Sequence, residues 1–525
     1  MATRETDVII IGAGISGLTA AKFLLSKDPN LHVLVLEAKD RVGGRTLSVE
    51  MKSNSGTETW DLGGQWVGMC QPHIMALLKE LGIETYKQYI TGTKFMQVGS
   101  KNKISTYQSD IPSLPLLGLL DMNKLIKLTD KLADKVDPED PFSCPNAELY
   151  DALTLEQFVD SHIWTHDVKD LLRAALRTMF GTELSQISLL YYLTYVASAG
   201  NLKNLLEATQ NTGQEYRIKG GSQQVSLKLL ESIGSSRVLL NEPVTRVEQN
   251  QDGVIVWSKN GCNYKCQKLI VSIPPFQIGK IQFSPVLPVE TREIIKRMPP
   301  SSIIKFVVTY PEAFWRTAGC SGEVVSNGGE SSVMSCDIGP VGVVYDATSC
   351  TGEPALLGFI GGIQAVQWQS QNAESRQSSV LKSLGEFFGE KVYTYLDYKE
   401  KVWDQEPYNE GGPVSCVGTG AMRYYAKGLR QPFDNIHFAG TESATVWCGF
   451  MNGAVQAGNR AAIEVLYDLR PQLVSAQDLK GIKRPRKQLA KVETTGRKVI
   501  RWTFRLGALT VLMFTVRKVY QQISN

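Results

Sequence analysis

The sequence predicts an α/β fold in which a domain built on a parallel sheet is interrupted by a second, mixed α+β domain. Three observations support this prediction: an apolar run followed by spaced glycines near the N-terminus, a second apolar run ending in an acid, and later returns of strand-like and glycine-rich segments. With 525 residues, 43% of them hydrophobic, the chain is long enough for two or three domains with large cores.

The first strand is predicted at residues 8–11, an apolar β-branched run typical of a strand buried on both faces of a parallel sheet. Gly12, Gly14 and Gly17 follow at once, in the spacing G-x-G-x-x-G. Glycines in this pattern allow a tight turn, close approach of the backbone to a pyrophosphate, and packing of the next helix on the strand. That helix, expected at about residues 15–26, would direct its N-terminal N–H groups at the phosphates.

A second strand is predicted at residues 33–36 and leads into Glu37. This acid stands twenty residues beyond Gly17, where a carboxylate can accept hydrogen bonds from ribose hydroxyls. The glycine pattern alone is a weak signal. Because it lies between two strands with an acid at the end, it predicts a Rossmann-like dinucleotide-binding domain.

Four further motifs indicate a family. They are RVGGR at 41–45, DLGGQW at 61–66, FAGTES at 438–443 and WCGFMNGAV at 447–455. Together and in this order they resemble the motifs of flavin amine oxidases, and the chain is similar to the monoamine oxidase branch of that family. The resemblance spans residues 7–458 and implies an FAD-binding, Rossmann-like domain of the glutathione-reductase type, interrupted by a substrate domain.

The resemblance also implies which residues meet the FAD. Besides Gly12, Gly14, Gly17 and Glu37, these are Arg45, Gly63, Gly64, Gln65, Val244, Gly440, Thr441, Glu442, Phe450 and Met451. Arg41 is expected to help meet the pyrophosphate. Residues 449–455 are expected to open a helix whose N-terminus stabilises the negative charge of a reduced flavin.

The remaining elements follow from periodicity and punctuation. Helices are predicted at 72–84, through most of 120–210, at 225–233, near 378–388 and at 449–467, and strands at 237–240, 244–248, 254–258, 269–273, 303–310 and 356–360. The domain boundaries predicted from these elements are 1–84, 216–296 and 403–467 for the FAD-binding domain, 85–215 and 297–402 for the substrate domain, 468–498 for a basic linker and 499–520 for a C-terminal tail helix.

Lys305 is the leading catalytic candidate. It lies in an otherwise apolar strand, where the ordinary alternative is a lysine on the solvent face. The resemblance implies instead that this lysine holds a water against the flavin N5, and burial there would lower its pKa. The other catalytic candidates are Phe450, Val414 and Trp403, and the substrate-cavity candidates are Trp66, Tyr192, Gln214 and Phe450.

The chain departs from the family pattern beside the flavin. Monoamine oxidases place two tyrosines there, and aromatic rings in such positions align the substrate amine. Phe450 takes one position, and the other matches Val414, or Pro413 if the gap is placed earlier. Trp447 or Trp66 could compensate for the incomplete pair.

The same loop bears on how the flavin is attached. Vertebrate mitochondrial members use a cysteine directly after Gly-Gly, but here Pro413 stands in that place and Cys416 comes three residues later. Three residues of extended chain span about 10 Å. Cys448 is expected near the other end of the flavin. FAD is therefore expected to bind without a covalent bond.

Composition argues against several other functions. The net charge of +4 is small for this length and gives no reason to expect nucleic acid as a partner. Nine scattered cysteines with no C-x-x-C pair, and five histidines without a nucleophile beside them, predict no metal site and no catalytic triad. The cysteine usage favours a reduced, cytosol-facing protein.

The C-terminal region predicts a membrane anchor. Residues 506–516 form an eleven-residue apolar run after the basic linker at 468–498. As a helix this run rises only about 16 Å against a hydrocarbon core of about 30 Å. Extension back to Val499 gives eighteen residues, and Arg501 and Arg505 could snorkel to one interface. Animal monoamine oxidases, which this arrangement resembles, carry such a helix in the mitochondrial outer membrane with the catalytic part cytosolic; the alternative is a cytoplasmic protein.

The expected function is an FAD-dependent oxidase of primary or secondary amines that yields aldehyde, ammonia and H₂O₂. Aromatic monoamines are favoured over polyamines because the cavity-side stretches are rich in Tyr and Leu and show no acidic cluster. An L-amino-acid oxidase is an alternative that would need an arginine for the carboxylate, such as Arg173 or Arg177. A flavin-binding protein that has lost turnover is a third. The expected partners are the amine substrate, O₂ and a membrane. A homodimer is a further possibility.

Overall fold

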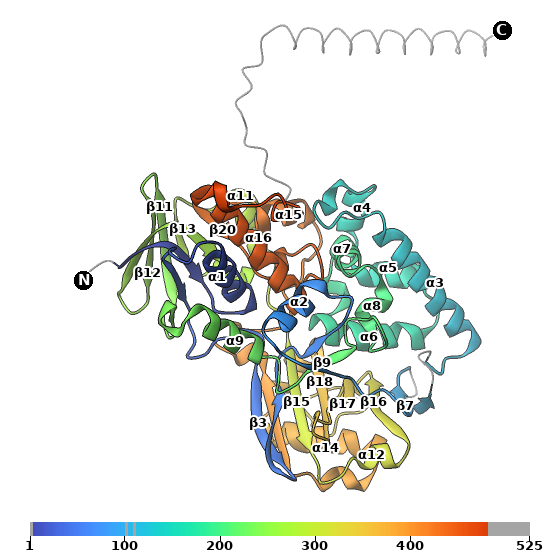
Figure 1. The fold of residues 1–525 in the computed structure, drawn as a ribbon. Helices are drawn as coiled ribbons and strands as arrows, with labels where there is room; N and C mark the ends of the chain where they lie inside the picture. The colour runs from blue at the N-terminus through green and yellow to red at the C-terminus, as the bar shows by residue number, and fades with distance from the viewer. Residues whose placement is uncertain (1–3, 100–102, 109–111, 481–525) are drawn as a thin grey trace, which may run out of the picture. The chain divides into compact units, whose positions relative to one another are not determined.

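The computed structural model describes residues 4–99, 103–108 and 112–480 (Figure 1). It confirms the predicted mixed α/β class, with two large sheets, two small ones and a separate group of helices. The chain contacts group residues 1–476 as one compact unit, so the domain boundaries given above stay predictions. The tail helix predicted at 499–520 and most of the basic linker lie outside the described residues.

The first large sheet has eight strands in the order β10-β2-β1-β13-β12-β11-β14, with β20 also paired to β13. The strands are β1 (Arg4–Ile11), β2 (Val33–Leu36), β10 (Val238–Leu239), β11 (Val244–Asn250), β12 (Gly253–Ser258), β13 (Asn263–Val271), β14 (Gln282–Ser284) and β20 (Ile436–Phe438). The four strands β10, β2, β1 and β13 run parallel, and β20 joins β13 in parallel. Three stretches far apart in sequence therefore build one sheet, as the predicted interruptions require.

Helices cover this sheet with small residues at the contact. They are α1 (Ile15–Lys27), α2 (Pro72–Glu80), α9 (Gln224–Ile233) and α16 (Met451–Leu469). α1 and α16 pack closely: a Cβ at Gly458 would lie 2.3 Å from the carbonyl oxygen of Ser16. This contact holds the N-terminal segment of the domain, which carries α1, against its C-terminal segment, which carries α16. The N-termini of both helices lie at the cavity described below.

The second large sheet has seven strands in the order β19-β15-β18-β17-β16-β7-β8. They are β7 (Thr93–Gln97), β8 (Ile104–Tyr107), β15 (Ile303–Thr309), β16 (Cys320–Ser326), β17 (Val343–Asp346), β18 (Ala355–Gly361) and β19 (Asp397–Val402). One face packs on α14 (Ala373–Phe388) through a core that includes Phe306, Ile360 and Leu384. The opposite face presents Lys305, Phe359 and their neighbours to a cavity.

A group of helices closes the remaining side of the molecule (Figure 1). It comprises α3 (Leu116–Ala133), α4 (Ala147–Ala152), α5 (Leu155–His162), α6 (His166–Phe180), α7 (Leu189–Ala199) and α8 (Leu202–Leu206). The other elements are β3 (Ser48–Ser53) with β4 (Gly56–Asp61), β5 (Trp66–Val67) with β9 (Tyr216–Ile218) and β6 (Thr85–Lys87), and the helices α10 (Pro275–Ile278), α11 (Val289–Lys296), α12 (Phe314–Thr317), α13 (Ile363–Trp368) and α15 (Met422–Arg430).

Several element predictions were wrong at their ends: the strand expected at 269–273 is part of the longer β13, which ends at Val271, and the helix expected near 378–388 begins at Ala373. The helix expected at 72–84 ends at Glu80, because Gly82 has a φ of +65° and the chain turns into β6. The strand expected at 237–240 is only Val238–Leu239, paired in parallel to β2. The helix expected from 449 begins at Met451, because Gly449 has a φ of +83° and Phe450 is extended.

Within the described ranges, no helix has both the length and the apolar character needed to cross a membrane.

Candidate active site

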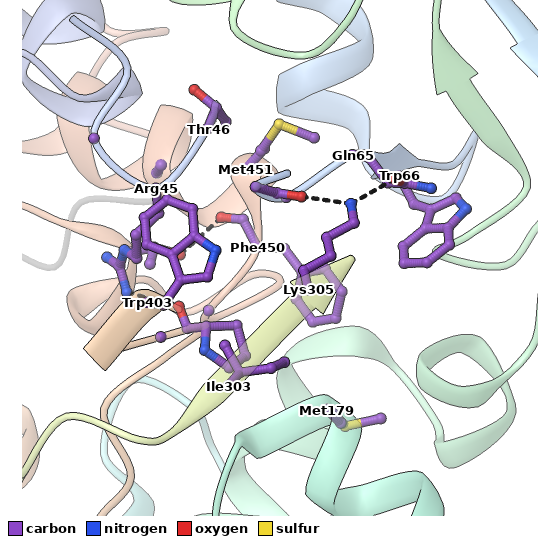
Figure 2. Close-up of a pocket in the computed structure, with 18 of the residues that line it drawn as sticks. Arg45, Thr46, Gln65, Trp66, Met179, Ile303, Lys305, Trp403, Phe450 and Met451 are labelled. Carbon is purple, nitrogen blue, oxygen red and sulfur yellow. Dashed lines mark hydrogen bonds between the residues drawn. The ribbon is translucent and has the colours of Figure 1, made fainter. Parts of the chain in front are cut away.

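One connected cavity of about 1080 Å³ reaches from the glycine-rich turn after β1 to the face of the second sheet and the helices opposite it. Sixteen of the residues predicted for the site line it: Gly12, Gly14, Glu37, Arg45, Gly63, Gly64, Gln65, Trp66, Gln214, Val244, Lys305, Trp403, Gly440, Thr441, Phe450 and Met451. Four predicted residues do not line it: Gly17, Tyr192, Val414 and Glu442. Figure 2 shows the part of the cavity around Lys305.

The glycine-rich turn leaves room where a phosphate would lie. A Cβ built on Gly14 meets no atom within 4 Å, although Gly14 lines the cavity and caps the N-terminus of α1. The helix has no side-chain cap and no acid in its first turn, so its positive end is presented to the cavity. Gly17 is needed for a different reason, since its Cβ would lie 2.1 Å from the Gly12 carbonyl oxygen. It packs the helix on the strand and does not touch the cavity.

Glu37 is held in place by backbone donors. Its two carboxylate oxygens accept from the N–H of Ala13 at 2.6 Å and the N–H of Lys39 at 3.0 Å. The side chain is buried at the end of β2 and lines the cavity on the far side of the glycine turn. This placement suits an acceptor for a ribose hydroxyl.

Arg45 faces the cavity with a carboxylate behind it. Its guanidinium forms an ion pair with Glu442 and donates to the carbonyl oxygen of Pro413 at 3.0 Å. Glu442 is buried and is not among the residues that line the cavity, and its direct contact with the cofactor stays a prediction. In the structure it positions Arg45.

Arg41 has its partners within the protein, and its expected part in meeting the pyrophosphate stays a prediction. Its guanidinium donates to the carbonyl oxygens of Thr46 and Gly44, both at 3.1 Å, and pairs with Glu406 at 2.7 Å. Burial alone would raise the pKa of Glu406, but hydrogen bonds from Lys39 and Lys401 and the nearby cations lower it to about 2. Arg41 therefore stabilises the loop that carries Arg45. It is not among the residues that line the cavity.

The N-terminus of α16 forms another part of the wall. Phe450 is its N-cap, Thr441 Oγ1 donates to the Phe450 carbonyl oxygen at 2.8 Å, and the first turn holds no acid. A Cβ on Gly449 would lie 2.5 Å from the hydroxyl oxygen of Tyr195, whose ring lies 5.9 Å from that of Phe450. The helix end, with its positive dipole, thus meets the cavity beside two aromatic rings.

Lys305 is buried, which excludes the solvent-facing alternative. Its strand, β15, lies between β18 and β19, and only 2% of the residue is exposed. The ammonium donates to the carbonyl oxygen of Gly63 at 2.8 Å and to Gln65 Oε1 at 2.6 Å (Figure 2). Burial lowers the pKa of Lys305 to about 7. The amide nitrogen of Gln65 is buried with no hydrogen-bond partner among the described atoms.

Aromatic side chains surround the lysine. The Trp66 ring lies 5.2 Å from that of Tyr345 and 5.9 Å from that of Phe359, and the Lys305 ammonium is within 6 Å of both Trp66 and Phe359. Trp403 also lines the cavity and donates its indole N–H to the Leu62 carbonyl oxygen at 2.9 Å. Trp66 therefore lies at the cavity wall beside Lys305, and its compensation for an incomplete ring pair stays a prediction.

Three predicted aromatic or loop residues lie elsewhere. Trp447 does not line the cavity, and its indole donates to the Cys70 carbonyl oxygen at 3.0 Å. Val414 is buried behind the wall, and Pro413 reaches the cavity in its place. Tyr192 lies in the helical core, whereas Tyr195, three residues further along α7, lines the cavity. Because α7 is buried on almost all sides, its sequence pattern does not indicate which face meets the cavity.

No cysteine is among the described residues that line the cavity. Cys416 is buried with its thiol near the Phe180 carbonyl oxygen, and Cys448 lies beside the Tyr425 hydroxyl. Burial raises the pKa of Cys416 well above its ordinary value and that of Cys448 to about 12. Both thiols are therefore held in the poorly nucleophilic, protonated form.

Neither arginine proposed for a substrate carboxylate lines the cavity. Arg177 pairs with Glu183 at 2.8 Å, and Arg173 pairs with Asp170 at 3.1 Å and Glu156 at 3.2 Å. The described residues include no group of three metal-ligating side chains that could hold an ion.

Sequence reasoning missed an ion pair on the cavity wall. Lys94 of β7 and Glu323 of β16 both line the cavity, with 3.1 Å between Nζ and Oε2. The two residues are more than two hundred positions apart, and only the pairing of β7 with β16 brings them together.

The residues present fit a flavin dinucleotide. One cavity brings together the groups that such a cofactor needs. It contains the open space at Gly14, the N-terminal ends of α1 and α16, the Glu37 carboxylate and the Arg45 guanidinium. The side-chain amide nitrogen of Gln65, beside Lys305, has no hydrogen-bond partner in the described structure, so a polar group of the cofactor could accept from it there.

Comparison with known proteins agrees with this fit. Residues 15–466 match the model of the flavin containing amine oxidoreductases. The chain is 36% identical to flavin-containing amine oxidase A of Canis lupus familiaris over 94% of its own length and 92% of the relative's. It is 33% identical to the probable flavin-containing monoamine oxidase A of Dictyostelium discoideum, over 87% of this chain and 97% of the other.

Solved structures show the same likeness. Cyclohexylamine oxidase from Brevibacterium oxydans superposes with a TM-score of 0.80 at 31% identity, covering 88% of this chain and 99% of that one. Putrescine oxidase bound to putrescine gives a TM-score of 0.81 at 28% identity, covering 89% and 100%.

Proposed function

Because the chain belongs to the flavin-containing amine oxidoreductase family, we propose that it is an FAD-dependent oxidase that converts primary or secondary amines and O₂ to aldehyde, ammonia and hydrogen peroxide. The observation that best supports this proposal is Lys305, buried at the cavity wall and hydrogen-bonded to Gly63 and Gln65. Family membership makes the chain an oxidoreductase acting on amines, while the oxidant and the products belong to the proposal.

FAD, when bound, supplies the two-electron chemistry. The chain would hold it through the end of α1, through Glu37 and Arg45, and through the end of α16. Lys305, with a pKa of about 7, holds or gives up a proton at Nζ near neutral pH, and in the protonated form its charge favours negative charge on oxygen. Lys305 itself is 2% exposed, so bulk solvent has little access to its ammonium.

The walls favour an aromatic monoamine. Apolar and aromatic side chains dominate the part of the cavity beyond Lys305: Ile126, Leu171, Leu172, Met179, Val343, Tyr345 and Phe359. The L-amino-acid alternative loses support, because Arg173 and Arg177 are paired elsewhere. A polyamine would need carboxylates to bind its additional ammonium groups. Two carboxylates line the cavity, Glu207 and Glu323, but each already pairs with a lysine.

A substrate panel tests this choice. Purified protein is given tyramine, spermine and L-leucine side by side, and peroxide release is measured. Tyramine is expected to give the highest kcat/KM. Faster turnover of spermine or L-leucine would replace the aromatic assignment, and absence of peroxide from all three would favour the binding protein without turnover.

We expect FAD to be held without a covalent bond, since no thiol lines the described cavity and Pro413 stands after Gly-Gly. Acid precipitation should leave the yellow colour in the supernatant, and a denaturing gel should show no flavin fluorescence at the protein band. A fluorescent band would contradict the expectation, and loss of that band in a Cys416→Ala variant would identify the residue responsible.

We further propose that the C-terminal residues anchor the protein in the mitochondrial outer membrane with its catalytic part in the cytosol, a proposal supported by the apolar run at 506–516 and its flanking arginines. Full-length protein should pellet with membranes, whereas a chain ending near Ser475 should stay in the supernatant without detergent. Full-length protein found wholly in the cytosolic fraction would contradict this and favour the cytoplasmic alternative.

A further inference from the structure

The side-chain amide of Gln65 is fixed at its oxygen and unused at its nitrogen. Oε1 accepts from the Lys305 ammonium at 2.6 Å, a bond drawn in Figure 2. Because an ammonium only donates hydrogen bonds, the oxygen faces Lys305 and the nitrogen Nε2 points away from it. Gln65 is buried and lines the cavity, and Nε2 has no partner among the described residues. A buried donor of this kind costs free energy until an acceptor meets it.

The loop that carries Gln65 is held by backbone hydrogen bonds. The Gly63 N–H donates to the Leu47 carbonyl oxygen at 3.1 Å. The Gly64 N–H donates to the Arg45 carbonyl oxygen at 3.2 Å. A Cβ at Gly63 would lie 2.4 Å from that same Arg45 oxygen, whereas a Cβ at Gly64, which lines the cavity, meets no atom within 4 Å. The loop is therefore packed against the Arg45 segment on one side and open to the cavity on the other.

Lys305 has no spare N–H in its neutral form. It donates to the Gly63 carbonyl oxygen at 2.8 Å as well as to Gln65, and a neutral amine has only two N–H bonds. Burial lowers the pKa of Lys305 to about 7, so near neutral pH a large share of the side chain is neutral. Both N–H groups then end on the loop at 63–65. Further donation from this loop toward the cavity has to come from the Gln65 amide.

The indole donors in the same part of the cavity are already used. The Trp66 indole N–H donates to Gln88 Oε1 at 2.9 Å, and that of Trp403 donates to the Leu62 carbonyl oxygen at 2.9 Å. Both tryptophans line the cavity and are drawn with Lys305 in Figure 2. The Gln65 amide is the donor that these residues leave available for a ligand.

The ring system of FAD carries nitrogen and oxygen acceptors and becomes more negative when it is reduced. We propose that Gln65 is a catalytic residue that accepts from Lys305 and donates from Nε2 to an acceptor atom of the bound flavin ring, so that its amide takes the place of a bridging water. Hydrogen bonds in such a chain polarise one another, and a donor directed at developing negative charge stabilises the reduced state. The inference rests on the proposed function, because it gives Gln65 a part in the flavin chemistry.

The reduction potential of the bound flavin tests this inference without turnover of any amine. Full-length, flavin-loaded protein is titrated with a chemical reductant beside a redox dye of known potential. Gln65→Met keeps the length of the side chain but removes the amide. It should shift the two-electron equilibrium about tenfold toward the oxidised flavin, a fall of about 30 mV in the potential.

The matched control is Gln71→Met. Gln71 is also a buried glutamine whose Nε2 has no partner among the described residues, but it is not among the residues that line the cavity. The potential of this variant should match that of the wild type. A fall equal to that of Gln65→Met would show that the effect does not come from contact with the flavin, and it would overturn the inference.

A second background separates contact with the flavin from support of Lys305. In Lys305→Met protein, Gln65→Met should still shift the equilibrium, by about threefold, because the amide keeps its acceptor but loses the lysine that orients and polarises it. No shift in that background would show that Gln65 acts only by holding Lys305. A full tenfold shift would show that the two residues act separately, and either result would overturn the inference.

An unchanged potential in Gln65→Met itself would also overturn it and would favour a water between Lys305 and the flavin. If Gln65→Met does not fold, Gln65→Glu decides, since a carboxylate still accepts from Lys305 but offers no N–H. A potential equal to that of the wild type would then count against the inference. Flavin-loaded protein that oxidises no amine would contradict the oxidase proposal, while the potentials would still test Gln65.

Discussion

Gly14→Val is expected to give colourless protein. A Cβ at Gly14 points into open cavity at the N-terminus of α1, so the valine methyls would occupy the space where the phosphate oxygens of FAD belong. No protein atom lies within 4 Å of this Cβ, so we expect the fold to accept the substitution and the loss of flavin to far exceed the loss of stability. The measurement is the flavin absorbance of the purified variant, with circular dichroism as a check on folding.

The matched control is Gly418→Val. Gly418 does not line the cavity, and its Cβ would make an ordinary contact of 3.6 Å with the Gln186 carbonyl oxygen. This variant should keep a normal yellow spectrum. A folded Gly14→Val protein that also keeps its yellow colour would show that the dinucleotide does not lie on this turn.

Lys305→Met is expected to slow the reaction with O₂ much more than the reaction with amine. The substitution keeps a long apolar chain in β15 but removes the donor to Gly63 and Gln65. Loss of one preorganised charged donor costs roughly 10²- to 10³-fold where negative charge develops on oxygen. Stopped-flow absorbance follows anaerobic reduction by amine and reoxidation by O₂ as separate traces.

Lys399→Met is the control for this substitution. Lys399 lies on the adjacent strand β19, donates to the Glu50 carbonyl oxygen at 2.6 Å and does not line the cavity. Both of its traces should match the wild type. Equal slowing of both traces by Lys305→Met, or slowing of the amine reaction alone, would assign Lys305 a structural or substrate-binding part instead.

The cofactor-binding half of the site could be predicted from local sequence. The glycine turn, Glu37 and Lys305 each depend on one short segment whose pattern sets its own conformation, and the structure places them at the cavity. Helix ends were less predictable, as at α16, where the positive φ of Gly449 delays the start by two residues.

The substrate half depends on contacts between distant segments. Tyr192 and Tyr195 are equally plausible in sequence because α7 is buried almost all round, and only packing sends Tyr195 to the cavity. Arg41 and Glu442 carry charges that suggest ligand contact, yet each is used by a partner far along the chain, Glu406 and Arg45. The pair of Lys94 and Glu323 exists only because β7 lies beside β16.

Simultaneous release of peroxide and aldehyde from tyramine is the most direct test of the proposed oxidase function. Purified, flavin-loaded protein is incubated with tyramine in air, and O₂ consumed, H₂O₂ and aldehyde are measured together. An amine oxidase should give the three in equal amounts, and product should disappear when O₂ is removed. Flavin-loaded protein that releases neither peroxide nor aldehyde from tyramine, spermine or L-leucine would contradict the proposed function.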